Sequence, residues 1–195
     1  MSRAILVYNE AAASTYADQL ARLLPSSADY RIIPCASRAE AARVGGDAEI
    51  IFCWRFPAEL FPEAHRLRWV QAMGAGVEDL VAAPIPGHVL LTRIVGLFGG
   101  PMSEYVFAHM LAHAQRLRRQ YAQQADRLWK PFVTGHLAGA RLGIAGVGSI
   151  GGAIAVRAKA FEMEVWGLAR TPGDRPHVDR IFTPDEVRQF TAGVD

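Results

Sequence analysis

The sequence lacks the features that define several large classes of protein. Its two cysteines, Cys35 and Cys53, are too few for a disulfide framework or, by themselves, for a zinc site. No apolar run approaches the roughly 18 residues of a transmembrane helix, and the first residues lack the apolar core of a signal peptide. The 21 basic and 19 acidic residues give a net charge of +2, which leaves no electrostatic footprint for nucleic acid. We therefore expect a soluble, cytoplasmic protein with reduced cysteines.

Hydrophobic residues make up 51% of the 195-residue chain, enough for a real buried core. Short apolar runs alternate with helix-like segments, which is the pattern of an α/β protein with a parallel sheet. The elements predicted for the first half are a crossover helix at 11–24 and strands at 4–8, 30–33, 48–53, 68–72 and 89–92. Pro34 is expected to end the second strand. The strands are short and apolar, which is typical of strands buried on both faces.

The pattern changes near residue 100. Glycines and a proline between residues 96 and 101 suggest a flexible junction, which we take as a domain boundary. The stretch 102–130 has no glycine or proline, and its apolar positions recur every three or four residues. This spacing predicts one long helix, ended by Pro131. The predicted domains are therefore 1–100 and 101–195, and the second begins with this linking helix.

The strongest functional signal is a glycine-rich turn in the second half of the chain. It follows a predicted strand at 141–145 and precedes a helix from about residue 152 to residue 161, after which a second strand is predicted at 164–168. The residues from Gly146 to Gly151 read G-x-G-x-x-G in the strand–turn–helix–strand order of a dinucleotide-binding unit. The alternative is a glycine-rich turn without a ligand, and the context favours the dinucleotide.

Each position of this motif has a physical task. Gly146 permits the tight turn, Gly148 has no side chain to block a pyrophosphate, and Gly151 lets the helix pack close to the strand. The first amides of the helix, at Ser149 and Ile150, then face the phosphates with the helix dipole behind them. We expect these five residues to bind the cofactor.

The residues after the second strand distinguish the two pyridine dinucleotides. An NAD site has an acidic side chain there for the ribose 2′-hydroxyl, whereas this chain has Ala169, Arg170 and Thr171. A guanidinium and a hydroxyl suit a 2′-phosphate, to which arginine makes bidentate, charge-assisted hydrogen bonds. We therefore expect NADP(H) rather than NAD(H), with a solvated surface arginine as the alternative for Arg170. The basic residue and the third glycine, Gly151, disfavour a methyltransferase.

Four stretches together resemble the D-isomer-specific 2-hydroxyacid dehydrogenases, particularly the glyoxylate/hydroxypyruvate reductase A branch. They are Phe52 to Pro57, Gln71 to Glu78, Met102 to Pro131, and the glycine motif with Arg170. The resemblance covers nearly the whole chain. It implies a flavodoxin-like substrate domain followed by the first part of a Rossmann domain, and NADPH-dependent reduction of small 2-oxo acids such as glyoxylate or hydroxypyruvate by hydride transfer.

The resemblance also implies a substrate site in the first domain. Backbone amides at Ala75, Gly76 and Val77 would hold the substrate carboxylate, and Trp54 would form a wall of the pocket. A glycine-rich turn from Gly74, following a buried strand, can form such an anion-binding concavity without side-chain charge. The alternatives are an ordinary turn and a core tryptophan at a strand end.

The chain departs from the family in its catalytic residues. The family reaction uses an arginine, a glutamate and a histidine from later segments, and this sequence has no Asn-x-x-Arg-Gly-like or Pro-His-x-Ala-like stretch. None of its six histidines lies in the family's context, so we assign no catalytic residue. We expect the chain to lack the C-terminal return of the substrate domain and to be inactive alone. The alternative function is a non-catalytic remnant that binds nucleotide or dimerises through the long helix.

Two further groups have ordinary explanations. His109 and His113 would share a helix face and could hold a metal, but residue 110 is methionine and no third ligand is evident. We expect surface or interface histidines and no metal. The arginines at 116, 118 and 119 are expected to be solvated or to face a second copy in a homodimer.

Overall fold

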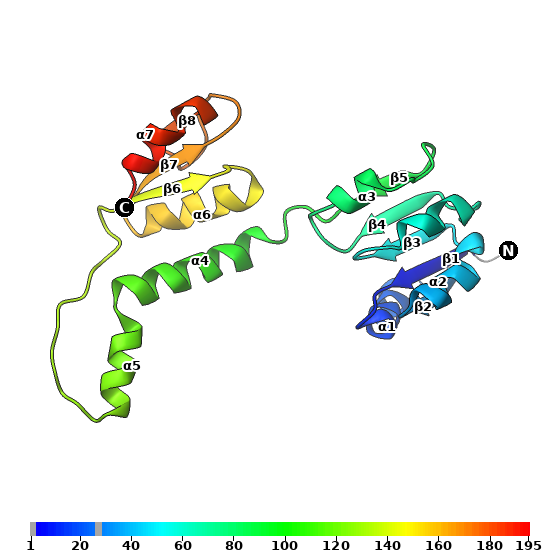
Figure 1. Cartoon of the computed structure of the whole chain (residues 1–195), viewed down its shortest axis with the longest axis horizontal. Coiled ribbons are helices and arrows are strands. Elements are labelled where there is room, and N and C mark those ends of the chain that lie inside the picture. The colour runs from blue at the N-terminus through cyan, green and yellow to red at the C-terminus, as the bar shows by residue number, and fades with distance from the viewer. Residues whose placement is uncertain (1–2, 26–28) are drawn as a thin grey trace. The chain divides into compact units, whose positions relative to one another are not determined.

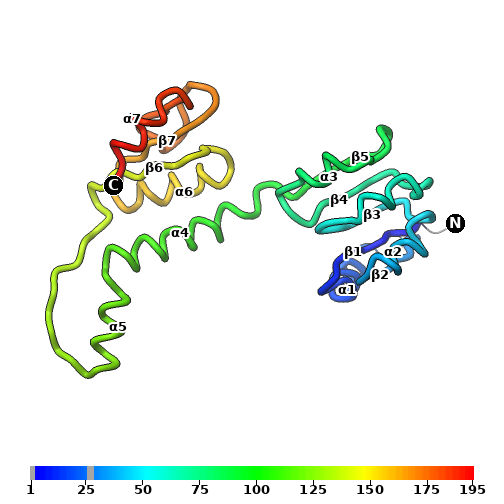
Figure 2. The backbone as a smooth tube through the Cα atoms, viewed as in Figure 1, coloured from blue at the N-terminus to red at the C-terminus, as the bar shows by residue number. Residues whose placement is uncertain are grey.

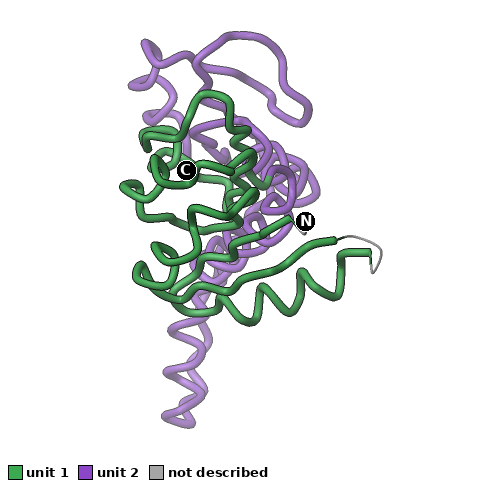
Figure 3. Tube along the Cα trace, turned by 90° about the vertical axis from the view of Figure 1, so that its right-hand side faces the viewer, with its two compact units in different colours: residues 1–94 green, residues 95–195 purple. Residues whose placement is uncertain are grey.

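The computed structural model describes residues 3–25 and 29–195, which form two compact units (Figure 1). Unit 1 covers Met1–Ile94 and unit 2 covers Val95–Asp195, and Figure 3 colours them green and purple. The division falls a few residues before the boundary predicted near residue 100. The predicted α/β class with parallel strands is confirmed. None of the helices in the described ranges combines the length and the apolar character that crossing a membrane requires.

Unit 1 contains a five-stranded parallel sheet. Its order, β2-β1-β3-β4-β5, is one of the common orders of doubly wound sheets, with the switch point between β1 and β3. The strands are β1 Arg3–Tyr8, β2 Tyr30–Cys35, β3 Ile50–Cys53, β4 Trp69–Ala72 and β5 Leu90–Thr92. Because all of them are parallel, the loops that follow β3 and β4 leave the sheet at the same edge.

Helices flank this sheet, and the core lies between the layers. They are α1 Ala13–Leu23, α2 Arg38–Val44 and α3 Glu78–Ala82, with short 3₁₀ turns η1 Gly45–Asp47 and η2 Ala58–Glu63. Leu6 and Val7 are adjacent in β1 and both are fully buried, so this central strand is covered on both faces. Leu90 in edge strand β5 is 60% exposed, so the expectation that all strands are buried on both faces is wrong at that edge.

The prediction that Pro34 ends the second strand is also wrong. β2 continues to Cys35, and Pro34 pairs with Val7 in the ladder. β2 is an edge strand with β1 as its one neighbour, and a proline is tolerated there because its missing N–H need not serve a second neighbour.

Unit 2 contains a three-stranded parallel sheet in the order β6-β7-β8. The strands are β6 Arg141–Ala145, β7 Glu164–Leu168 and β8 Arg180–Phe182; the helices are α4 Gly99–Ala114, α5 Leu117–Ala125, α6 Ser149–Ala160 and α7 Val187–Ala192, with the 3₁₀ turn η3 Pro184–Glu186. The predicted strands at 141–145 and 164–168 are confirmed. The helix between them begins earlier than predicted, at Ser149.

The single long helix predicted over 102–130 is wrong, because the chain turns between α4 and α5 (Figure 2). Arg116 adopts a left-handed backbone conformation with φ 52°. The carbonyl of Ala114 accepts a hydrogen bond from the N–H of Gly135 (2.8 Å) instead of continuing the helix. Apolar spacing does not reveal this break, since the partner comes from a distant segment.

Gly99 to Pro101 in the predicted flexible junction are helical, whereas Gly96 lies before the helix with φ +86°. Gly99, Gly100 and Pro101 form the first turn of α4, where proline costs no helical hydrogen bond. A Cβ on Gly99 would lie 2.9 Å from the Cβ of Ala153 in α6. The buried Ser103 hydroxyl lies 2.7 Å from the Gly99 carbonyl, to which it donates. The beginning of α4 therefore packs directly on the helix that follows the glycine motif.

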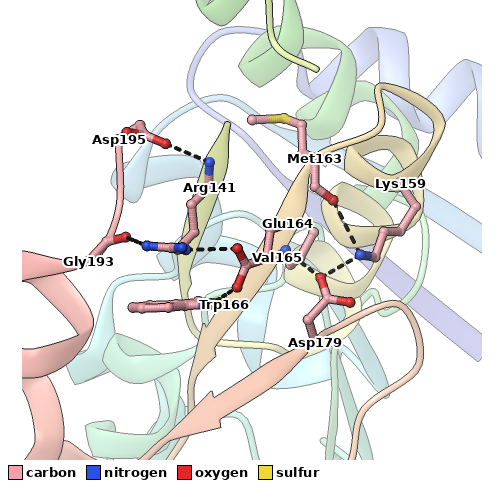
Figure 4. Close-up of polar contacts among 9 residues, drawn as sticks. All are labelled: Arg141, Lys159, Met163, Glu164, Val165, Trp166, Asp179, Gly193 and Asp195. Carbon is pink, nitrogen blue, oxygen red and sulfur yellow. Dashed lines mark hydrogen bonds and ion pairs between the residues drawn. The ribbon is translucent and has the colours of Figure 1, made fainter. Parts of the chain in front are cut away.

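A polar cluster fastens the end of the chain to the start of β6 (Figure 4). Arg141 donates to Glu164 (Nε–Oε2 2.9 Å) and to the Gly193 carbonyl (2.6 Å), while its backbone N–H donates to Asp195 (2.7 Å). The indole N–H of Trp166 donates to Glu164 (2.6 Å). The hydrogen bonds from Trp166 and then Arg141 lower the pKa of Glu164. This cluster lies at the amino end of the strands, opposite the glycine motif.

Candidate functional site

The glycine motif forms the turn from β6 into α6. Gly146 has φ +98°, a conformation that residues with a side chain rarely adopt. Its N–H donates to the carbonyl of Leu168 (2.9 Å), the last residue of β7. The turn is thereby held beside the end of β7, where Arg170 and Thr171 follow.

The first amides of α6 remain available to a ligand. Within the described residues, the N–H groups of Gly148, Ser149 and Ile150 donate to no partner, and the first amide of this turn to do so is Gly152, to the Gly148 carbonyl (2.8 Å). All three residues are exposed. A Cβ on Gly148 would meet nothing within 4 Å, so the space in front of the amides is open. Unpaired amides at a helix start attract an anion.

The loop after β7 carries positive charge. Arg170 and Thr171 are exposed, and Ala169 is anchored by its N–H to the Phe182 carbonyl (2.9 Å). A residue that sequence reasoning did not assign, Arg175, reaches back to Thr171, with 3.5 Å between Nη2 and Oγ1. The signal for it was a second arginine just beyond a Gly-Asp turn.

In unit 1, the loops after β3 and β4 bring together two parts of the expected substrate site. The ring of Trp54 lies 3.2 Å from the position that a Cβ on Gly74 would occupy, so a side chain at residue 74 would press on the indole. Trp54 is 58% exposed, which rules out the alternative of a core tryptophan. A cavity of about 260 Å³ is lined by Trp54, Gly76 and Val77, among others.

The turn after β4 has its carbonyls occupied and its amides free. Arg93 Nη1 donates to the Ala75 carbonyl (2.9 Å), and the Ile94 N–H donates to the Gly74 carbonyl (3.2 Å). In the described ranges, no hydrogen bond is donated by the backbone N–H groups of residues 75–77. Such a turn can accept a carboxylate through main-chain N–H groups.

Charged side chains surround the same cavity. Arg55 lies 3.4 Å from Asp79 (Nε–Oδ2), and both side chains are exposed. The carboxylate of Glu78 lies 3.1 Å from the position of a Cβ on Gly76. Arg55 and Arg93 thus stand against the two carboxylates of Glu78 and Asp79, so the charged side chains roughly cancel and the free N–H groups supply the attraction for an anion.

The remaining candidates do not form a site of their own. No group of three or more histidine, cysteine or acidic side chains in the described part of the chain is arranged to hold a metal. The ring of His109 packs edge-on against Tyr105, 4.4 Å between centroids. Cys35 and Cys53 are free and buried, and burial raises the pKa of the Cys53 thiol to about 12, so it stays protonated and unreactive at neutral pH.

Comparisons with known proteins are consistent with this arrangement. The family described as "D-isomer specific 2-hydroxyacid dehydrogenase, NAD binding domain" matches residues 107–195. A curated relative, glyoxylate/hydroxypyruvate reductase A of Yersinia enterocolitica, is 29% identical over 153 residues, which cover 75% of this chain and 49% of the relative. The chain thus spans about half the length of that relative.

Solved structures share the fold. A D-isomer specific 2-hydroxyacid dehydrogenase family protein from Aeromonas salmonicida matches with a TM-score of 0.86 and 32% identity, over 100% of this chain and 62% of that one. An NADPH-dependent glyoxylate/hydroxypyruvate reductase from Sinorhizobium meliloti, solved with NADP and sulfate, has a TM-score of 0.81 and 24% identity, over 100% and 60%. Because its sequence identity is only 24%, the Sinorhizobium structure shows that the fold is shared and nothing more.

Proposed function

We propose that this chain is a member of the D-isomer-specific 2-hydroxyacid dehydrogenase family, that unit 2 binds NADP(H) and that unit 1 binds a small 2-oxo acid. The proposed overall reaction is the reduction of glyoxylate or hydroxypyruvate. The reduced nicotinamide, when bound, supplies the hydride for the carbonyl carbon. The chain's own residues hold the cofactor's phosphates and the substrate's carboxylate.

The pyrophosphate fits the turn between β6 and α6. Its negative charge would meet the unpaired N–H groups of Gly148, Ser149 and Ile150, and the open space at Gly148 admits a phosphate against the backbone. The absence of a side chain at Gly151 is what allows the first turn of α6 to pack against the carbonyl of Gly146. The free amides are the observation that carries the proposed function.

The 2′-phosphate of NADP(H) is proposed to bind at Arg170 and Thr171. Both residues are exposed and follow the strand whose last carbonyl anchors the glycine turn. Residues 169–171 provide no carboxylate to accept a ribose 2′-hydroxyl bond, and a guanidinium matches a phosphate in charge and in geometry. The preference for NADP(H) over NAD(H) rests on this pair.

The substrate carboxylate is proposed to bind the amides of Ala75, Gly76 and Val77, with Trp54 as a wall of the pocket. The support is the cavity beside Trp54 and the N–H groups of residues 75–77, which donate to no partner among the described residues. No residue of this chain matches the family's catalytic arginine, glutamate or histidine, so we assign no proton donor.

The test of the proposed function is calorimetric titration of the full chain with NADPH and with NADH. We expect binding of NADPH, and weaker binding of NADH because it lacks the 2′-phosphate. Absence of heat with both dinucleotides, from a folded sample, would contradict the proposal. We expect no NADPH oxidation with glyoxylate from this chain, because no proton donor is assigned to it. Measurable turnover would contradict that expectation and would exclude the alternative, a non-catalytic nucleotide-binding module.

We also propose that the chain forms a homodimer through α5 and the segment after it. Four large apolar side chains there are exposed: Tyr121 (64%), Leu128 (53%), Trp129 (92%) and Val133 (84%). Exposed apolar side chains gathered within a short stretch of chain are typical of a protein interface. Sedimentation velocity should show a dimer whose dissociation constant rises for a Trp129→Ser variant; a monomer at all concentrations would contradict this part.

A further inference from the structure

The loop between β7 and β8 carries an arginine that the proposed cofactor site does not yet include. Arg175 is half-buried, unlike the exposed Arg170 in the same loop. Its Nη1 donates to the carbonyls of Gly173 (3.1 Å) and Asp174 (3.0 Å), and its Nη2 lies 3.5 Å from the Thr171 hydroxyl. The side chain is therefore folded back on its own loop, toward a residue assigned to the 2′-phosphate.

We propose that Arg175 is a second guanidinium of the 2′-phosphate site and sets the preference for NADP(H) together with Arg170 and Thr171. This inference rests on the proposed function, because it assumes that the dinucleotide binds at the glycine turn. The ligand group is the phosphate on the adenosine ribose, a monoester with a second pKa of about 6 that is mostly dianionic at neutral pH. Two guanidinium groups can neutralise two negative charges.

The loop conformation keeps Arg175 in place before a ligand arrives. Gly173 has φ +125°, a conformation open to glycine, and this turn brings the two acceptor carbonyls onto one nitrogen of Arg175. Holding the guanidinium in advance reduces the side-chain entropy lost on binding. Its Nη2 donates to the Thr171 hydroxyl oxygen across 3.5 Å, so the guanidinium lies next to a residue assigned to the 2′-phosphate.

The charges around the loop leave Arg170 and Arg175 available. Among the described residues, neither arginine forms an ion pair with a carboxylate. Asp174 contributes its backbone carbonyl to Arg175, and the nearby Asp179 is engaged by Lys159 and by the N–H of Val165. With Arg170 and Arg175 against the single carboxylate of Asp174, the loop keeps a net positive charge.

The experiment compares two ligands that differ only in the 2′-phosphate. The full chain is titrated by calorimetry with 2′,5′-ADP and with 5′-AMP. For Arg175→Gln we expect about fivefold to tenfold weaker binding of 2′,5′-ADP, the effect of losing one charge-assisted contact, and unchanged binding of 5′-AMP. Arg175→Lys keeps the charge and should restore most of the affinity. Arg22→Gln, which removes an exposed arginine from α1 in unit 1, is the matched control and should behave as wild type.

The outcomes separate the two proposals. If wild type binds neither ligand, the proposed cofactor site fails and this assignment with it. If wild type prefers 2′,5′-ADP and Arg175→Gln retains that preference in full, only the role of Arg175 is overturned. Equal weakening toward both ligands, or a lysine variant as weak as the glutamine variant, would indicate a damaged loop and would also overturn the assignment.

Discussion

A Cβ atom on Gly151 would lie 2.1 Å from the carbonyl oxygen of Gly146. That distance is far inside van der Waals contact, and the obstacle is backbone that is itself held in place, since the N–H of Gly146 donates to Leu168 at the end of β7. The third glycine of the motif is therefore needed for the turn to fold, whether or not a cofactor binds there.

Gly151→Ala should destabilise unit 2 by about 2 kcal/mol or more, because overpacking against backbone forces the strand and helix apart. Urea unfolding measures the change. Gly152→Ala, one residue later in the same helix, meets nothing within 4 Å and should be neutral or slightly stabilising. Equal stability of the two variants would contradict the close contact between the Gly151 position and the Gly146 carbonyl.

Gly148→Ala should leave the fold intact and weaken NADPH binding at least tenfold. The added Cβ meets no protein atom within 4 Å but stands where the pyrophosphate must approach the free amides. Calorimetry gives the affinity, and thermal unfolding without ligand checks the fold. Gly152→Ala again serves as the control, and an undiminished affinity for Gly148→Ala would place the phosphates elsewhere.

Arg93→Gln should weaken 2-oxo acid binding in unit 1 by about threefold to tenfold. Its guanidinium holds the Ala75 carbonyl (2.9 Å), and losing this charge-assisted bond loosens the turn that presents the amides. Binding is reported by the part of the glyoxylate-dependent fluorescence quenching that a Trp54→Phe variant loses, which isolates Trp54 among the four tryptophans. Arg66→Gln removes an arginine that pairs with Glu49 and should leave the quenching unchanged; a matching loss in that control would refute a specific role for Arg93.

The stability of unit 2 should fall on acidification. The hydrogen bond from Lys159, then that from the N–H of Val165, lowers the pKa of Asp179. A carboxyl group whose pKa is lower in the folded state stabilises the fold above its unfolded pKa, near 4, and loses that contribution as the pH falls through the folded value. Unfolding free energies measured from about pH 6 down to about pH 2 should therefore decrease at the acid end.

Asp179→Asn should reduce this dependence, since the substituted side chain no longer titrates, while Glu164, whose pKa the hydrogen bonds from Trp166 and Arg141 also lower, retains part of it. Asp126→Asn removes a carboxylate that forms no ion pair within the described residues and should keep the wild-type slope. A slope in Asp179→Asn as steep as in wild type would show that other carboxyl groups dominate the acid response.

The sequence predicts correctly those parts of the site whose structure depends on residues close together along the chain. The strands at 141–145 and 164–168 and the turn between them lie where the spacing of apolar residues and glycines put them. The helix from residue 102 was predicted too long because its end depends on Gly135, whose N–H takes the Ala114 carbonyl. A hydrogen bond between distant segments leaves no periodic signal.

By itself, the sequence determined the α/β class, the position of the glycine turn and the basic residue after β7, because glycine spacing, apolar runs and charge act over a few residues. Only the tertiary structure decided that Pro34 lies within an edge strand, that Trp54 stands exposed beside Gly74, and that Arg175 turns back to Thr171. The first depends on which strands pair in the sheet, and the other two depend on how loops fold back on themselves. Such properties belong to the packed chain and cannot be read from the order of its residues.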